Sequence, residues 1–153
     1  MLGRSSLRLA QIARQLQVSP LQIRTMSSQI EIIKTANAPP AVQGVYSQAT
    51  KANGMIFCSG QIPMNPAGEM VEGDIQVHTR QCINNLKAVL ESAGSSLEKI
   101  VKVNVFLASM DDFAKMNEIY SEMFAEPKPA RSCVAVKTLP KNVDVEIECI
   151  ALA

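Results

Sequence analysis

Apolar and polar residues follow two different periods along the chain, and each period predicts a different kind of element. Between residues 74 and 93 apolar residues recur every three or four positions, which predicts an amphipathic helix that Asp74 caps and Gly94 ends. Between residues 101 and 107 apolar and polar residues alternate, as in a strand with one buried face. Helical spacing then returns, and Ser109 or Asp111 is the expected cap of a second helix.

Four other stretches have the short apolar or alternating pattern of strands, and turn residues bound them. They are residues 29–34, 55–59, 132–137 and 143–151. The predicted order is therefore strand, strand, helix, strand, helix, strand, strand. This order is typical of an α+β domain with both helices packed on one face of a mixed sheet.

The last predicted strand has three carboxylates on one face, Asp144, Glu146 and Glu148, and apolar residues on the other. Three acids on a strand usually form a solvated face. The same face continues with Ile150 and Leu152, which indicates that part of it is covered. A carboxylate at the edge of the covered part could orient a water molecule. The pattern alone leaves both interpretations open.

Length and composition indicate one soluble domain. The chain has 153 residues, of which 47% are apolar and 19% charged. A chain of this length can bury a core that needs no metal or disulfide to fold. No apolar run approaches the roughly 20 residues that a membrane-spanning helix needs, so no membrane partner is expected.

Residues 1–25 differ from the rest of the chain. They contain four arginines and no acid, with leucine and isoleucine at helical spacing. This composition is typical of a mitochondrial transit peptide and predicts a location in the matrix. Arg24 precedes Met26 by two residues, which suits processing after Thr25; Met26 is alternatively a second start that would give a cytosolic form. Residues 26–153 then form the functional domain.

The charge of this domain argues against nucleic acid as a partner. From residue 26 onward, 11 lysines and arginines stand against 14 aspartates and glutamates, which leaves a net charge of −3. Such a domain lacks the basic stripe that neutralises phosphates.

Metal and nucleophile motifs are not evident. The four cysteines show no C-x-x-C spacing, and His78 is the only histidine, so no zinc site is predicted. His78 lies one helical turn before Cys82, but no third group is evident to orient such a pair. We therefore expect an exposed histidine on the helix and Cys82 as a core thiol.

Arg131 is the main candidate for ligand binding. Only Arg80 and Arg131 remain once the leader is set aside, in a domain with nine lysines. A guanidinium grips a carboxylate through two parallel hydrogen bonds, which an ammonium does not reproduce. Arg131 shares a strand face with Cys133. The alternative is a surface arginine in a rim ion pair, worth about 0–1 kcal/mol.

Six groups of residues between about Ile30 and Leu152 keep a characteristic order and spacing. They are Tyr46-Ser47-Gln48-Ala49, Ser59-Gly60-Gln61-Ile62-Pro63, Ile100 to Leu107, Asn117 with Tyr120, Pro129-Ala130-Arg131-Ser132-Cys133 and Leu139-Pro140. Together they resemble the Rid family, the reactive imine and enamine deaminases of YjgF type. With the leader, the chain is most similar to the mitochondrial fungal branch of this family.

This resemblance implies a fold, an assembly and a reaction. The fold is a chorismate-mutase-like α+β domain, with a mixed six-stranded sheet and two helices on one face. The assembly is a homotrimer around a central barrel, with sites in the clefts between subunits. The reaction is hydrolysis of 2-imino acids, such as 2-iminobutanoate and 2-iminopropanoate from pyridoxal-phosphate enzymes, to 2-oxo acids and ammonia, without a cofactor.

The resemblance also implies roles for individual residues. Arg131 matches the arginine that holds the substrate carboxylate, and Glu146 matches the acid that positions the attacking water. The other matches are substrate-binding positions that line the cleft, with Cys133 a lining residue first and a nucleophile second. They are Tyr46, Gly60, Asn117 and Cys133.

Lys128 departs from the family, which often has an aromatic residue before the Pro-Ala-Arg motif, at a position expected close to the cleft.

The alternative function is a non-catalytic trimer that binds metabolites or client proteins, in the manner of a chaperone. Ribonuclease activity is a third and weaker hypothesis, given the acidic domain and its single histidine.

Overall fold

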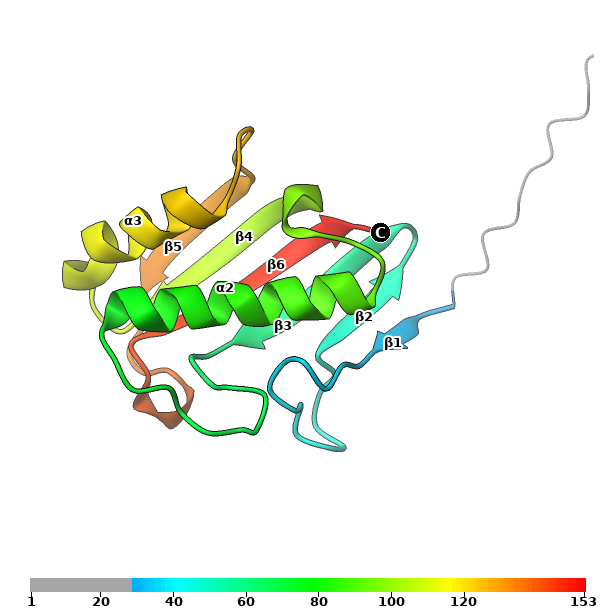
Figure 1. Ribbon diagram of the computed structural model, residues 1–153, viewed down its shortest axis with the longest axis horizontal. Helices are drawn as coiled ribbons and strands as arrows, with labels where there is room; N and C mark the ends of the chain where they lie inside the picture. The colour runs from blue at the N-terminus through cyan, green and yellow to red at the C-terminus, as the bar shows by residue number, and fades with distance from the viewer. Residues whose placement is uncertain (1–28) are drawn as a thin grey trace, which may run out of the picture.

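The computed structural model describes residues 29–153, and the transit peptide predicted for residues 1–25 lies outside this range (Figure 1). Six strands and two long helices make up the described chain. The strands are β1 (Glu31–Ile33), β2 (Ala49–Ala52), β3 (Met55–Gln61), β4 (Ile100–Leu107), β5 (Ala130–Ala135) and β6 (Val145–Leu152). The helices are α2 (Ile75–Ser92) and α3 (Phe113–Met123).

All six strands form one sheet in the order β1-β2-β3-β6-β4-β5. Strands β4 and β5 pair in parallel and are joined through α3, whereas the other neighbours pair antiparallel. The expected mixed six-stranded sheet is therefore confirmed. Figure 1 shows α2 and α3 lying against the same face of this sheet, as the pattern predicted.

The hydrophobic pattern missed β2, because its four residues, Ala-Thr-Lys-Ala, neither alternate clearly nor form an apolar run. The structure pairs β2 with β3 through a turn at Asn53-Gly54. Both turn residues have positive φ, 50° and 75°. Tight hairpin turns of this hand require such angles, and Asn-Gly adopts them at little cost. This dipeptide was a signal in the sequence that indicated the hairpin.

Helix α2 begins and ends where the sequence predicted. The Asp74 side chain accepts hydrogen bonds from the backbone N–H groups of Gln76 and Val77, both at 3.1 Å. Gly94 has φ of 79° just after the last turn, where the chain leaves the helix. The second helix differs from expectation. Ser109 accepts from the N–H of Asp111 in a one-turn 3-10 helix (Met110–Asp112) that leads into α3.

The sheet has one covered and one open face. Alternate residues of β3, β4 and β6 pack under the helices and form the core: Ile56, Cys58, Val103, Val105, Leu107, Val145, Ile147, Cys149 and Ala151. The open face presents large apolar side chains that are 44–49% exposed: Phe57, Val134 and Leu152. Glu146 and Glu148 of β6 lie on the open face, as the alternation predicted.

Within residues 29–153 no helix is long and apolar enough to cross a membrane. The same residues contain no group of three or more His, Cys, Asp or Glu side chains that could hold a metal ion. All four cysteines are free thiols.

Candidate functional site: two half-sites on opposite faces of the sheet

Arg131 lies on β5 among side chains that hold its guanidinium in place. Its Nη1 donates to Oδ1 of Asn117 on α3, at 2.6 Å. The guanidinium carbon is 4.4 Å from the ring centre of Tyr120 and 5.8 Å from that of Phe113, also on α3. Both distances are within the range of cation–π attraction. We call Arg131, Asn117, Tyr120 and Cys133 the arginine half-site.

Arg131 makes no ion pair with any carboxylate among residues 29–153. Arg80, the other arginine of this range, makes two hydrogen bonds to Glu122, at 2.9 and 2.6 Å. The amide of Asn117 and the ring of Tyr120 are uncharged, so they do not neutralise Arg131, and they leave most of its N–H groups free. The arginine half-site is therefore suited to an anionic ligand, and a carboxylate matches the fork of the guanidinium.

Cys133 follows Arg131 by two residues on the same face of β5, as predicted, and packs against the core. Burial raises the pKa of its thiol, and the nearby charge of Arg131 opposes this shift only in part. The thiolate is the nucleophilic form of cysteine, so a raised pKa disfavours covalent chemistry at neutral pH. The geometry favours Cys133 as a lining residue.

The second half-site surrounds Glu146. A cavity of about 520 Å³ opens between the loop before β2, the end of β3 and the start of β6, and the sequence-predicted residues Tyr46, Gly60 and Glu146 all line it. Lys141 and Glu148 line it as well. We call Tyr46, Gly60 and Glu146 the glutamate half-site.

Glu146 packs directly on the backbone of Gly60. A Cβ atom built on Gly60 would lie 1.9 Å from Oε1 of Glu146, a distance that no side chain tolerates. The carboxylate is thus held against β3 by contact with backbone atoms. Burial raises the pKa of the Glu146 carboxyl above its ordinary value, and the charge of Glu148 raises it further. A raised pKa brings a carboxyl closer to the range in which it exchanges protons at neutral pH.

Polar side chains hold the loop that carries Tyr46. The Gln48 side chain, 3% exposed, accepts from the N–H of Thr35 at 2.7 Å and donates to the carbonyls of Thr35 and Pro39, at 3.1 and 2.7 Å. Ser59 donates to the carbonyl of Ser47 at 2.6 Å. Tyr46 is half exposed, as expected of a side chain that a ligand contacts.

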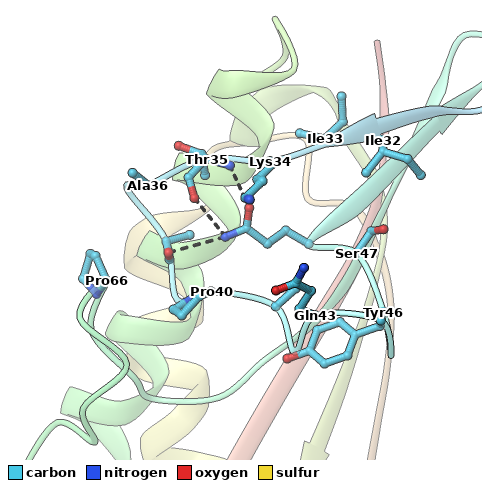
Figure 2. Close-up of a pocket in the computed structure, with 14 residues that line it drawn as sticks. Ile32, Ile33, Lys34, Thr35, Ala36, Pro40, Gln43, Tyr46, Ser47 and Pro66 are labelled. Atoms are coloured by element: carbon cyan, nitrogen blue, oxygen red, sulfur yellow. Dashed lines mark hydrogen bonds between the residues drawn. The ribbon is translucent and has the colours of Figure 1, made fainter.

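A second cavity of about 670 Å³ lies on the other side of this loop, between β1 and residues 35–48. Figure 2 shows Tyr46 at one end of this cavity and Thr35 and Ala36 at the other, with hydrogen bonds of the loop drawn as dashed lines. Gln48 and Tyr46 line both cavities. Gln48 therefore shapes the glutamate half-site by fixing the loop, a role that sequence reasoning did not assign to it.

The two half-sites do not meet within one chain. Arg131 is in register with Val103, which lies under the helices, so the arginine half-site belongs to the covered side of the sheet. Glu146 is in register with Phe106 on the open side. Neighbouring residues across a ladder project to the same face. Arg131 and Glu146 therefore project from opposite faces.

Comparison with known proteins identifies the family. The family model described as Endoribonuclease L-PSP matches residues 35–153. The chain belongs to the Rid family. The protein mmf1 of Schizosaccharomyces pombe, named mitochondrial, is 62% identical over 112 residues, which are 71% of this chain and 68% of mmf1.

Crystal structures of Rid-family relatives have the same fold. The crystal structure of yeast Mmf1 shares 48% sequence identity with this chain and matches it with a TM-score of 0.79. The match covers 81% of this chain and 98% of the Mmf1 chain. The crystal structure of Escherichia coli TdcF with bound serine shares 43% sequence identity with this chain and has a TM-score of 0.76. The match covers 80% of this chain and 98% of the TdcF chain. The mitochondrial location expected from the leader is confirmed by relatives named mitochondrial, which include MMF1 of Saccharomyces cerevisiae.

The surroundings of His78 differ from the exposed helix position that the sequence predicted. Its Nδ1 lies 2.8 Å from both carboxylate oxygens of Asp144, and its Nε2 lies 3.0 Å from the carbonyl oxygen of Val71. The prediction of an exposed helix histidine was wrong. The spacing of residues within the helix could not show a contact with Asp144, which is 66 positions away in the sequence. Burial raises the pKa of the Cys82 thiol strongly, which argues against a Cys–His pair.

Lys128, which the sequence analysis expected close to the cleft, folds back on α3. Its Nζ donates to the carbonyls of Ser121, at 2.9 Å, and Phe124. Ser121 lies in the last turn of α3 and Phe124 is the residue that caps its end, where a cation interacts favourably with the helix dipole. Lys128 thus holds the segment between α3 and β5.

Proposed function

We propose that the chain is a deaminase that hydrolyses small 2-imino acids and their enamine tautomers to 2-oxo acids and ammonia. The proposed substrates are 2-iminobutanoate and 2-iminopropanoate, the reactive products of pyridoxal-phosphate enzymes such as threonine dehydratase. No cofactor takes part in the proposed reaction. The observation that carries this proposal is the guanidinium of Arg131, which keeps its charge free of any carboxylate of the described chain.

The substrate chemistry matches this observation. A 2-imino acid has one permanent carboxylate and, beside it, an electrophilic carbon that water attacks readily once it is held in place. Two parallel hydrogen bonds to Arg131 fix the carboxylate and thereby the position of the reacting carbon. Tyr46 and Cys133 then line the substrate side chain, and Asn117 holds Arg131.

Glu146 acts on water in this proposal. Its carboxylate takes a proton from a water molecule while the water oxygen bonds to the imine carbon, and the electron pair of the C=N bond moves to nitrogen. The proton passes from Glu146 to that nitrogen. Glu146 next moves the proton of the new hydroxyl group to the amine nitrogen, the C–N bond of the tetrahedral intermediate breaks as the carbonyl forms, and ammonia leaves. The raised pKa of the Glu146 carboxyl suits these proton transfers.

The complete site needs a second copy of the chain. Since Arg131 and Glu146 project from opposite faces, we propose a homotrimer in which the arginine half-site of one subunit faces the glutamate half-site of the next. The apolar side chains of the open sheet face are suited to contacts between subunits. The serine bound by the relative TdcF has an α-carboxylate and an α-nitrogen, as the proposed substrates do.

An assay with three variants tests this function. The purified full-length chain is added to a threonine dehydratase reaction, and the release of 2-oxobutanoate is compared with the uncatalysed rate. We expect acceleration by the wild type and a loss of at least about thirtyfold in Arg131→Met and Glu146→Gln, corresponding to ~2 kcal/mol or more. Arg80→Met is the matched control and should keep the wild-type rate.

Two results would contradict the proposal. Equal rates with Arg131→Met and Arg80→Met would remove Arg131 from the site. Binding of 2-oxobutanoate by the wild type without any acceleration would favour the non-catalytic alternative, a trimer that binds metabolites or client proteins.

Ribonuclease activity is a second candidate, because the matching family model is described as an endoribonuclease. The only histidine, His78, has both ring nitrogens close to acceptors of the chain itself, which leaves neither for acid–base work on RNA. RNA cleavage that is lost in Arg131→Met but kept in Arg80→Met would favour this candidate. Cleavage that is equal in both variants indicates contamination.

A further inference from the structure

Arg131 is held by only one hydrogen bond within residues 29–153, from Nη1 to Asn117. The arginine side chain has four rotatable bonds, and a single hydrogen bond leaves the plane of the guanidinium free to turn about it. Two-point binding of a carboxylate depends on that plane, because both N–H groups must lie in the plane of the two oxygens. Another contact is needed to fix it.

The ring of Tyr120 is the contact suited to this task. It lies 4.4 Å from the guanidinium carbon, closer than the ring of Phe113 at 5.8 Å. The ring itself is fixed, since Tyr120 is 5% exposed and stacks on Phe124 with ring centres 4.4 Å apart and 26° between the planes. A fixed ring under a guanidinium restricts its rotation.

The hydroxyl group of Tyr120 does not contribute a hydrogen bond to Arg131. Its oxygen is buried and has no hydrogen-bond partner among the described residues. Burial also raises the pKa of the phenol, so the hydroxyl stays protonated at neutral pH. Tyr120 therefore acts on Arg131 through the face of its ring.

A ring offers an advantage over a carboxylate in this position. A carboxylate would neutralise the guanidinium and occupy the two N–H groups that a ligand needs. The face of an aromatic ring attracts the cation without removing its charge or using its N–H groups. Held in this way, Arg131 remains available to an anion.

We propose that Tyr120 is a positioning residue that sets the plane of the Arg131 guanidinium for two-point binding of the substrate carboxylate. The inference rests on the proposed function for the identity of the substrate. It goes beyond that function by assigning the precision of carboxylate binding to an aromatic residue of α3, through its ring and not through its hydroxyl.

Three variants test this inference through KM, kcat and the affinity for 2-oxobutanoate, measured by calorimetry. Tyr120→Leu should raise KM and the dissociation constant about tenfold, the size of a partly buried cation–π contact, with a smaller change in kcat. Tyr120→Phe keeps the ring and should restore both values to within about twofold of the wild type.

Ile119→Ala is the matched control for packing, because it removes a buried apolar side chain of α3 but leaves the rings of Tyr120 and Phe124 in place. It should lower the melting temperature and leave KM near the wild-type value. The inference is overturned if Ile119→Ala raises KM as much as Tyr120→Leu does, or if Tyr120→Phe fails to restore it.

The affinity measurement separates this inference from the proposed function. If the wild type binds 2-oxobutanoate but accelerates no deamination, the proposed function fails and the Tyr120 variants still decide the inference through the dissociation constant. If the wild type deaminates and Tyr120→Leu binds as well as the wild type, the inference fails and the function stands. Wild-type protein that neither binds nor deaminates overturns both.

Discussion

Glu146 packs against Gly60, and only glycine leaves room for its carboxylate at that point. Contact with backbone atoms removes water from one side of the carboxyl, and Glu148 places a like charge two residues away on the same face. Both effects disfavour the charged form and raise the pKa. Glu148 is itself held, since it accepts a hydrogen bond from Asn104 at 2.8 Å.

A pH prediction follows for the deaminase reaction. Glu146 must be ionised to take a proton from water, so the rate falls as the pH falls through its pKa. Because this pKa is raised, the acid limb of the rate profile should lie above that of an ordinary glutamate. Glu148→Gln removes the like charge, which lowers the pKa of Glu146 and moves the limb to lower pH.

The glutamine of this variant can still accept the hydrogen bond from Asn104, so the geometry is preserved. Glu122→Gln, which changes an exposed acid paired with Arg80, is the control and should leave the limb in place. The profile of kcat/KM against pH measures the shift. A limb that moves to higher pH in Glu148→Gln would contradict the prediction.

Helix α2 covers much of the sheet, and its first turn depends on one side chain. The carboxylate of Asp74 accepts two backbone N–H groups that have no partner within the helix. Asp112 occupies the equivalent position before α3, but its side chain makes no capping hydrogen bond. The two helices thus provide a matched pair of acids in the same local position.

Asp74→Ala should lower the free energy of unfolding by about 1 kcal/mol, because it leaves both N–H groups without their acceptor. Asp112→Ala should cost less than half as much, about 0.5 kcal/mol or below, as no cap is lost. Urea denaturation followed by circular dichroism measures both values. Equal losses in the two variants would show that the Asp74 cap contributes little.

The molecule as a whole divides the proposed chemistry between two faces of one sheet. Arg131 on β5 belongs to the covered side and Glu146 on β6 to the open side, and strand β4 lies between these two strands. A rigid sheet cannot bring both side chains to one small substrate. Assembly of several copies, with the apolar open face buried between them, would join the two half-sites.

Mixed trimers test this arrangement directly. Arg131→Met and Glu146→Gln, each inactive alone, are coexpressed with different tags and purified as mixed species. In every mixed trimer of the two variants, one cleft of three joins an intact arginine to an intact glutamate, so about a third of the wild-type rate should return. Arg131→Met mixed with differently tagged Arg131→Met is the control. Mixed species without activity would indicate that the two residues act within one chain.

The sequence by itself determined the properties that depend on local spacing. The period of residues 74–93 located α2 with its cap, and the alternation after Val143 assigned Glu146 to the open face. The rarity of arginine and the Pro-Ala-Arg-Ser-Cys motif singled out Arg131. The roles proposed for Arg131 and Glu146 stay predictions that the assays above test.

Tertiary structure decided the contacts between residues that are distant in the sequence. Strand β2 gave no clear pattern because its pairing with β1 and β3 defines it. His78 meets Asp144 across 66 positions, and Gln48 holds a loop that begins 13 positions earlier. Periodicity reports only which face of its own element a side chain occupies. The ring under Arg131 follows from the way α3 packs on the sheet, and the separation of the two half-sites follows from the faces to which β5 and β6 direct Arg131 and Glu146.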